Sequence, residues 1–159
     1  MIAIRKLLDK CLEFICSVVF VVMILVVLYQ IFVRTVLGNP NTVTEEFVKF
    51  SLVWLSLLAS AYVVGKRSHL SVSLLSDHLN PQKQRILDTV VQILFVLFAA
   101  VVMIFGGFKA VSVTMGQLSP SLGIPMGLIY LAVPVSGILI LVYSLLNLIQ
   151  GKPQEESEG

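Results

Sequence analysis

The sequence predicts an all-α membrane protein of four transmembrane helices that form a single domain over residues 1–151. Hydrophobic residues make up 57% of the 159-residue chain and charged residues only 13%, whereas soluble domains have roughly 25% charged residues. A helix needs about 20 apolar residues to cross a hydrocarbon core, and the sequence holds four such stretches. We place the spans at about 12–36, 44–65, 84–109 and 126–149.

The first span contains an uncharged stretch from Phe14 to Val33 and is closed by Arg34. This stretch is longer than the apolar part of a signal peptide, and no small-x-small cleavage site follows it. We therefore interpret it as a retained membrane anchor. Cys11 and Cys16 lie together at its start, so they cannot join distant segments. We interpret them as small packing residues, with a redox or lipidation role as the alternative.

The second span begins after a cluster of helix breakers at residues 38–41. Thr42 and Glu45 have the S/T-x-x-E spacing of a capping box, so the helix is predicted to start there. Its apolar body runs from residue 50 to residue 65. Leucines then recur at helical spacing within residues 68–80, which predicts a short amphipathic helix along the membrane surface.

The third span begins with an Asn-Pro pair at residues 80–81, which suits an N-cap and a first helical position, and is predicted to end at Lys109. No residue is charged from 110 to 151, a run that is too long for one helix. Glycine and proline divide this run into an extended or partly re-entrant connection over residues 117–125 and a fourth span. A kink in the fourth span is expected at Pro134.

The distribution of lysine and arginine predicts the orientation of the chain. Four crossings put both termini on one side of the membrane, and more basic residues lie on that side than on the other. The terminal side has Arg5, Lys6, Lys10, Lys66, Arg67, Lys83, Arg85 and Lys152, against Arg34, Lys49 and Lys109 opposite. The positive-inside rule therefore places both termini in the cytoplasm, including a tail over residues 152–159 that is predicted to be disordered.

The sequence gives little support for an enzyme or a self-contained pump. Every charged residue lies at or beyond a predicted helix end, whereas ion pathways need ionisable groups within the hydrocarbon. Metal-ligand spacing, a nucleophile elbow and a phosphate-binding loop are lacking, so we expect no catalytic, metal, substrate-binding or cofactor residues. The net charge of +2 gives no reason to expect nucleic acid. Hydrogen bonds between packed helices are expected for the polar residues Gln30, Gln92, Thr114 and Asn147.

The densest charge cluster consists of Glu45, Glu46 and Lys49, at the outer end of the second helix. Carboxylates in a first turn interact favourably with the helix dipole, and either acid can pair with Lys49 within the chain. A contact of the same cluster to another subunit is the open alternative. Trp54 lies deeper in this helix, and we interpret it as a lipid-facing or core residue, with an interface anchor as the alternative.

Several segments of the chain match the pattern of a known family. They are Arg34, Thr44-Glu45-Glu46, Val53-Trp54-Leu55, Lys66-Arg67-Ser68-His69-Leu70 and the segment from Ser119 to Tyr130. The segment from Ser119 to Tyr130 is the most specific of them. With these segments the whole chain resembles the small membrane (DctQ-like) subunit of tripartite ATP-independent periplasmic (TRAP) transporters. Val43 departs from the pattern, because the family commonly has tryptophan at this position.

The resemblance implies a sodium-dependent importer in three parts, found in the cytoplasmic (inner) membrane of a bacterium or archaeon. A periplasmic DctP-like protein would capture an organic acid, either a dicarboxylate or a sugar acid such as sialic acid, and a large DctM-like subunit would move it using Na⁺. This chain would be a small scaffold subunit, surrounded by membrane lipid, that braces the large subunit and contributes to docking of the binding protein.

The resemblance and the charge pattern together indicate which residues contact partners. The expected interface residues are Arg34, Glu45, Glu46, Lys49, Trp54, Arg67 and His69. The expected periplasmic docking residues are Gln117, Ser119, Pro120 and Ser121. Two alternatives remain. One is a stand-alone small multidrug-type exporter, which would need an acid buried in the membrane, and the other is a membrane assembly protein unrelated to transport.

Overall fold

The computed structural model describes residues 2–38, 41–66 and 81–150, and its regular elements in these ranges are all helical. Four of the described helices are long and apolar enough to cross a membrane. They are Arg5–Val36, Thr42–Gly65, Thr89–Thr114 and Met126–Ile149. The prediction of an all-α protein with four membrane-spanning helices is therefore confirmed. The predicted interfacial helix at 68–80 and the tail at 152–159 lie outside the described residues.

Helix α1 (Ile2–Val36) is a continuous helix of 35 residues. At 1.5 Å per residue it is about 50 Å long, which exceeds a hydrocarbon core of about 30 Å. Its uncharged stretch from Phe14 to Val33 is about as long as that core is thick. The helix therefore starts well before the predicted span, and its first turns, with Arg5 and Asp9, lie beyond the uncharged stretch.

Helix α2 (Thr42–Gly65) starts two residues before the predicted second span. Its N-cap is Asn41, whose side chain accepts a hydrogen bond at 3.1 Å from the backbone N–H two residues later. The predicted capping box of Thr42 and Glu45 is wrong, because Asn41 already satisfies a donor of the first turn. Glu45 instead accepts a hydrogen bond from Lys49.

The third span consists of three consecutive helical segments, α4 (Pro81–Leu97), the π-helix η1 (Phe98–Gly106) and α5 (Gly107–Thr114). The proline occupies the first helical position, as the sequence predicts. The helix continues to Thr114, five residues beyond the predicted boundary at Lys109. Lys109 is exposed, and its long side chain can reach the polar headgroup region from this position near the helix end.

The fourth span consists of α6 (Met126–Tyr130) and α7 (Ala132–Gln150), and the helix is interrupted at Leu131. Pro134 accounts for the interruption, because it has no N–H to donate to the carbonyl of Tyr130 four residues earlier. The interruption lies three residues before Pro134 and separates α6 from α7, and a bend of the helix axis at Pro134 stays a prediction.

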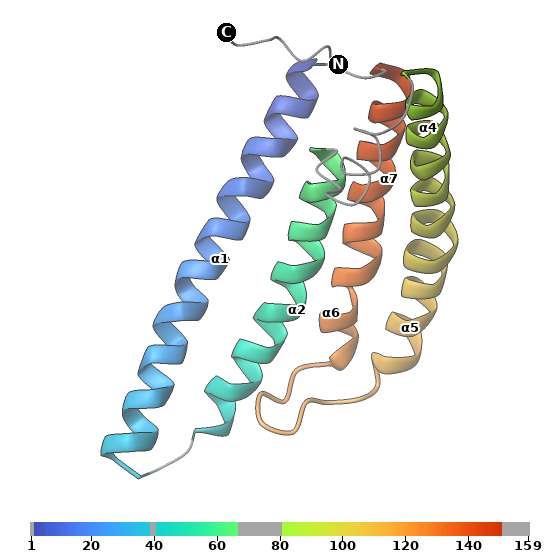
Figure 1. The fold of residues 1–159 in the computed structure, drawn as a ribbon. Coiled ribbons are helices and arrows are strands. Elements are labelled where there is room, and N and C mark those ends of the chain that lie inside the picture. The colour runs from blue at the N-terminus through green and yellow to red at the C-terminus, as the bar shows by residue number, and fades with distance from the viewer. Residues whose placement is uncertain (1, 39–40, 67–80, 151–159) are drawn as a thin grey trace, which may run out of the picture.

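The helices pack in series, with α7 in the centre (Figure 1). Helix α1 packs chiefly on α2, α2 on α7, and α7 on α4 and η1, while α5 packs on α6. In the most apolar stretch of the fourth span 44% of the residues are buried. In the corresponding stretch of α1 only 6% are buried. The start of α1 and the end of α7 lie at the same end of the molecule, as expected for four crossings (Figure 1). This series leaves broad apolar surfaces uncovered.

Glycine allows the neighbouring helices to approach α7 closely. A Cβ atom added at Gly65 would lie 2.6 Å from Cδ1 of Tyr143, and one added at Gly137 would lie 2.7 Å from Cβ of Met103. Both distances are shorter than real Cβ contacts, so a side chain at either position would push the helices apart. The buried apolar residues of this contact region are Ala61, Val64, Ala99, Met103 and Ile140.

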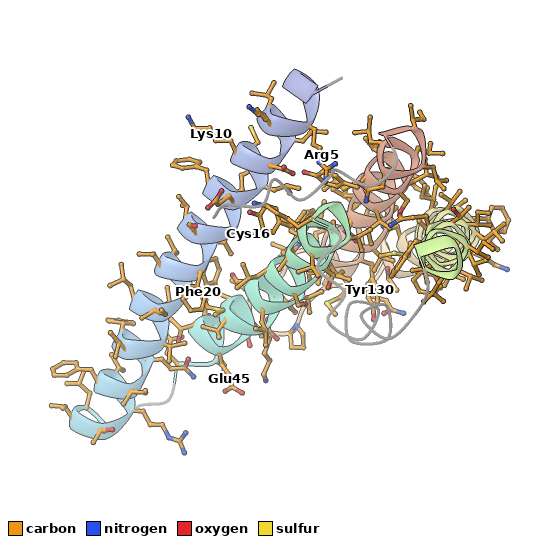
Figure 2. The ribbon with its side chains drawn as sticks, turned by 45° about the horizontal axis from the view of Figure 1, so that its top comes forward. Arg5, Lys10, Cys16, Phe20, Glu45 and Tyr130 are labelled. Atoms are coloured by element: carbon orange, nitrogen blue, oxygen red, sulfur yellow. The ribbon has the colours of Figure 1, made fainter. Side chains whose placement is uncertain are left out.

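Polar contacts join α1 to α2 and α7 at the end where α2 terminates. Nη2 of Arg5 donates a hydrogen bond to the carbonyl oxygen of Gly65 at 2.5 Å. The hydroxyl of Tyr143 donates to Oδ1 of Asp9 at 2.7 Å. Figure 2 shows Arg5 on the side of α1 towards the other helices and Lys10 on the opposite side. The first turns of α1 are therefore held by directional contacts as well as by packing.

Interhelical hydrogen bonding, predicted for four polar residues, is confirmed at Asn147, whose Nδ2 donates to the carbonyl of Val64 at 3.1 Å. The prediction is wrong at Thr114, because its hydroxyl donates to the carbonyl of Ala110 in the same helix, at 2.8 Å. Gln92 is buried at 3% exposure, and no partner for its Oε1 is found in the described part of the chain. For Gln92 and Gln30 the interhelical bond stays a prediction.

Replacement of Gly65 by alanine is expected to weaken the packing of α2 on α7. The new Cβ atom would overlap the buried ring of Tyr143, and overpacking of this kind typically costs about 1–3 kcal/mol. Thermal unfolding of the purified protein in detergent measures the effect. Gly106→Ala is the matched control, because the nearest atom to its added Cβ is 3.8 Å away. Equal loss of stability in both variants would contradict the close contact.

Candidate functional site

The charged side chains of the described spans lie near the two ends of the helices. Helix α1 has no charged residue between Glu13 and Arg34, and α2 has none between Lys49 and Lys66. A buried carboxylate or amine in the middle of a span is the usual mark of a proton relay or ion pathway. The described spans have no such group at mid-depth, so a functional site is to be sought at the ends.

Glu46 accepts more hydrogen bonds than its neighbour Glu45 at the end of the molecule where α2 begins. Its Oε2 accepts a hydrogen bond from the hydroxyl of Ser119. The same oxygen accepts hydrogen bonds from the backbone N–H groups of Ser121 at 3.2 Å and Leu122 at 3.1 Å. Successive N–H groups that converge on an anion form a nest, and here the anion is a side chain of the same protein. Glu46 therefore attaches the α5–α6 loop to α2.

The α5–α6 loop, residues 115–125, folds back on itself. Backbone N–H groups of Ser119 and Met126 donate across the loop to the carbonyls of Ile124 and Gln117, at 2.9 and 2.8 Å. Gly123 has a φ of 65°, a conformation that residues with a side chain rarely adopt. The connection predicted as extended or partly re-entrant is therefore a hydrogen-bonded, hairpin-like turn.

The four predicted docking residues differ in their surroundings. Gln117 and Pro120 are exposed, and Ser121 is half-buried. Ser119 is only 3% exposed and its hydroxyl is directed to Glu46, so it has a role within the chain. Leu118, which sequence reasoning did not single out, is 66% exposed. Hydropathy could not distinguish Leu118 from the buried residues around it, because the whole segment is uncharged and only the turn determines which side chains are exposed.

The other predicted partner residues are more scattered. Lys49 and Glu45 form an ion pair at 2.7 Å in which both side chains are more than half exposed, so it adds little stability. This is the pairing within the chain that the sequence allows, and a contact to another subunit stays a prediction. Arg34 is exposed in the last turn of α1. Arg67 and His69 lie outside the described residues.

Trp54 lies in an apolar groove of about 660 Å³ between α1, α2 and the α6–α7 segment. Aliphatic and aromatic side chains dominate its lining, including Phe50 of α2 and Leu139 of α7. Leu122 and Ile124 also belong to the lining, so one side of the α5–α6 loop faces the groove. A charged organic acid would find few polar partners there, so we do not interpret the groove as a substrate site.

The part of the chain that the structure describes contains no candidate metal site. No group of three or more His, Cys, Asp or Glu side chains lies close enough together there to hold an ion. Cys11 and Cys16 are both free thiols, the first exposed and the second partly buried. The best-defined polar arrangement at the end of the molecule where α2 begins is therefore Glu46 with the α5–α6 loop.

Comparison with known proteins gives consistent matches. The family model for the DctQ component of tripartite ATP-independent periplasmic transporters matches residues 23–152. Two proteins of Haemophilus influenzae, each named as a TRAP transporter small permease protein, are similar to this chain. One is 26% identical over 132 residues, covering 83% of this chain and 81% of the relative. The other is 27% identical over 147 residues, covering 91% and 88%.

A third relative comes from Oleidesulfovibrio alaskensis and is named isethionate TRAP transporter permease protein DctMQ. It is 33% identical over 94 residues, which is 58% of this chain but only 15% of that protein. The family match includes α1 from residue 23 onward and the whole of α2 to α7. The predicted resemblance is therefore confirmed, and this multi-pass membrane protein belongs to the DctQ family, a component of tripartite ATP-independent periplasmic transporters.

Proposed function

We propose that this chain is the small accessory subunit of a TRAP importer in the cytoplasmic membrane, where it braces a large DctM-type transport subunit. The serial packing of the helices carries the proposal. It leaves α1 and much of α2 uncovered, while the middles of the described spans contain no charged group. A row of helices with these properties is better suited to packing against another subunit than to forming a pathway for an ion or an acid.

A larger membrane partner is supported by two observations. The relative named DctMQ combines the DctM and DctQ designations in one protein, of which the matched part is 15%. That share fits a small subunit joined to a much larger one. The apolar surfaces of α1, α2 and the third span are extensive enough to be shared between lipid and another helical subunit.

The substrate and the coupling ion are assigned to the other subunits. We propose that the large subunit uses Na⁺ and moves an organic acid, such as a dicarboxylate or sialic acid, that a periplasmic DctP-like protein delivers. The groove at Trp54 is apolar, which supports leaving substrate recognition to the partners. The chain would then be a transporter component and not an enzyme, with both termini in the cytoplasm.

Affinity purification of the tagged chain from its native membrane is expected to recover a larger multi-span protein, because the uncovered apolar helices offer a surface on which another helical subunit can pack. Mass spectrometry of the eluate identifies that protein, and an unrelated four-helix membrane protein with the same tag is the control. Recovery of the chain only as a monomer or a homo-oligomer would argue against the bracing role.

Reconstitution tests whether the chain transports by itself. Liposomes that contain only this chain are expected to take up no radiolabelled organic acid, because the described spans have no charged group at mid-depth. Liposomes with the copurified large subunit and the binding protein are expected to take it up when a sodium gradient is imposed. Uptake by the chain alone would contradict the accessory role, whereas sodium-independent uptake by the complex would contradict only the coupling ion.

A further inference from the structure

The serial packing of the helices leaves an open groove along α2. Helix α1 packs on one side of α2 and the α6–α7 segment on the other, and residues of all of them line the groove. The deepest residues of the lining, Leu12, Leu58 and Ile129, are buried. Those at the rim are exposed, with Ile15 of α1 at 44% and Leu128 of α6 at 45%. The groove therefore has a buried floor and an open side.

The two ends of the groove differ. At one end the hydroxyl of Tyr143 on α7 donates to Asp9 of α1, so the two walls of the groove meet there. At the end where α2 begins, Leu122 of the α5–α6 loop belongs to the lining. Glu46, which accepts hydrogen bonds from this loop, directly precedes Phe47, the first α2 residue of the lining. The groove therefore runs from the polar start of α2 into its membrane-spanning part.

The lining of the groove favours hydrocarbon over water. No side chain of the lining is charged, and its polar groups are the thiol of Cys11, the hydroxyl of Ser51 and the indole N–H of Trp54. A buried water needs about two to four polar partners, and apolar spaces without them stay dry and take up apolar molecules. An empty groove would also lose dispersion contacts along its whole surface. Within a bilayer, hydrocarbon is therefore the material that fills it.

The dimensions of the groove favour acyl chains over a helix. Its α2 residues extend from Phe47 to Leu58 and its α1 residues from Leu8 to Val19, each about 16 Å along a helix axis. A volume of about 660 Å³ over at least that length gives a mean cross-section of at most about 40 Å². A helix with its side chains is about 10–12 Å across and fills about 80–110 Å². An alkyl chain is only about 4–5 Å across, because carbon atoms approach one another to about 3.5–4.0 Å.

We propose that this groove is a binding site for the acyl chains of one membrane phospholipid, with the headgroup at the end where α2 begins. A length of about 16 Å is about half of a hydrocarbon core, as expected for a lipid of a single leaflet. The contact of Tyr143 with Asp9 closes the other end. Chains in the groove contact α1, α2 and α6–α7 together, so this lipid is retained more firmly than lipid on the outside of a single helix. The inference does not depend on the proposed function, because this chain alone forms the groove.

The fluorescence of Trp54 tests the assignment. It is the only tryptophan of the sequence and it lines the groove, so its emission reports on the occupant. The full chain is freed of lipid in detergent and titrated with a phosphatidylcholine that carries two bromine atoms on one acyl chain, because bromine quenches tryptophan on contact. We expect quenching that saturates when one lipid is bound per chain. Quenching that rises in proportion to the lipid without saturating, or no quenching, would overturn the assignment.

A substitution that fills the groove makes the same assay specific. Ser51→Phe is expected to raise the lipid concentration for half-maximal quenching by roughly tenfold or more, because the ring takes the place of several buried methylene groups. Ser56→Phe is the matched control, since Ser56 is exposed on the same helix outside the lining, and it should leave the curve unchanged. The melting temperature shows whether each variant folds, and Ser51→Leu is the milder replacement. Identical curves for a folded position-51 variant and the control contradict the site.

A photoactivatable lipid locates the site in the native complex. Cells are fed a fatty acid that carries a diazirine, the tagged chain is purified in detergent, and the preparation is irradiated and mapped by mass spectrometry. We expect lipid crosslinks at Ile15 or Leu128, and not at Val101, which is 60% exposed on the third span. Crosslinks at Val101 to the same extent, or none in the groove, would overturn the lipid site even if the large subunit is recovered. Groove crosslinks without a large subunit would instead count only against the proposed function.

Discussion

The close packing of its neighbours on α7 is the contact on which the rest of the structure depends. On one side Gly65 leaves room for the ring of Tyr143, and on the other Gly137 leaves room for Met103. Because α7 is occupied on both sides, α1 can pack chiefly on α2, and the helices form a series instead of a closed bundle. A membrane helix pair gains most from such close approach, since lipid chains are as apolar as the side chains they replace.

Directional polar contacts complete this packing near the two ends. At one end Arg5 and Asp9 join α1 to α2 and α7, and at the other Glu46 joins α2 to the α5–α6 loop. The helices between these layers are held by apolar contact, and the hydrogen bond of Asn147 to Val64 adds to the layer that contains Arg5. A structure fixed at its ends, with no charged group at mid-depth in the described spans, is suited to holding a partner in place.

The fold was largely predictable, because charge and hydropathy report directly on what can lie in a bilayer. The spans follow from that constraint, and the break near Pro134 follows from the missing backbone N–H of proline. The π-helix η1 was not predictable, since its uniformly apolar sequence is compatible with any helical winding. Glu46 and Ser119 were both identified as candidates, but their contact joins residues 73 apart and depends on tertiary structure. Leu118 was missed because only the turn determines that it is exposed.

The central claim is that this chain braces a partner and does not itself carry substrate. A cryo-electron microscopy map of the purified complex tests it most directly. The expected map shows a larger helical subunit covering part of the apolar surface of α1, α2 or the third span, with substrate density confined to that subunit. Substrate density among the four helices of this chain, or a complex made only of copies of it, would contradict the claim.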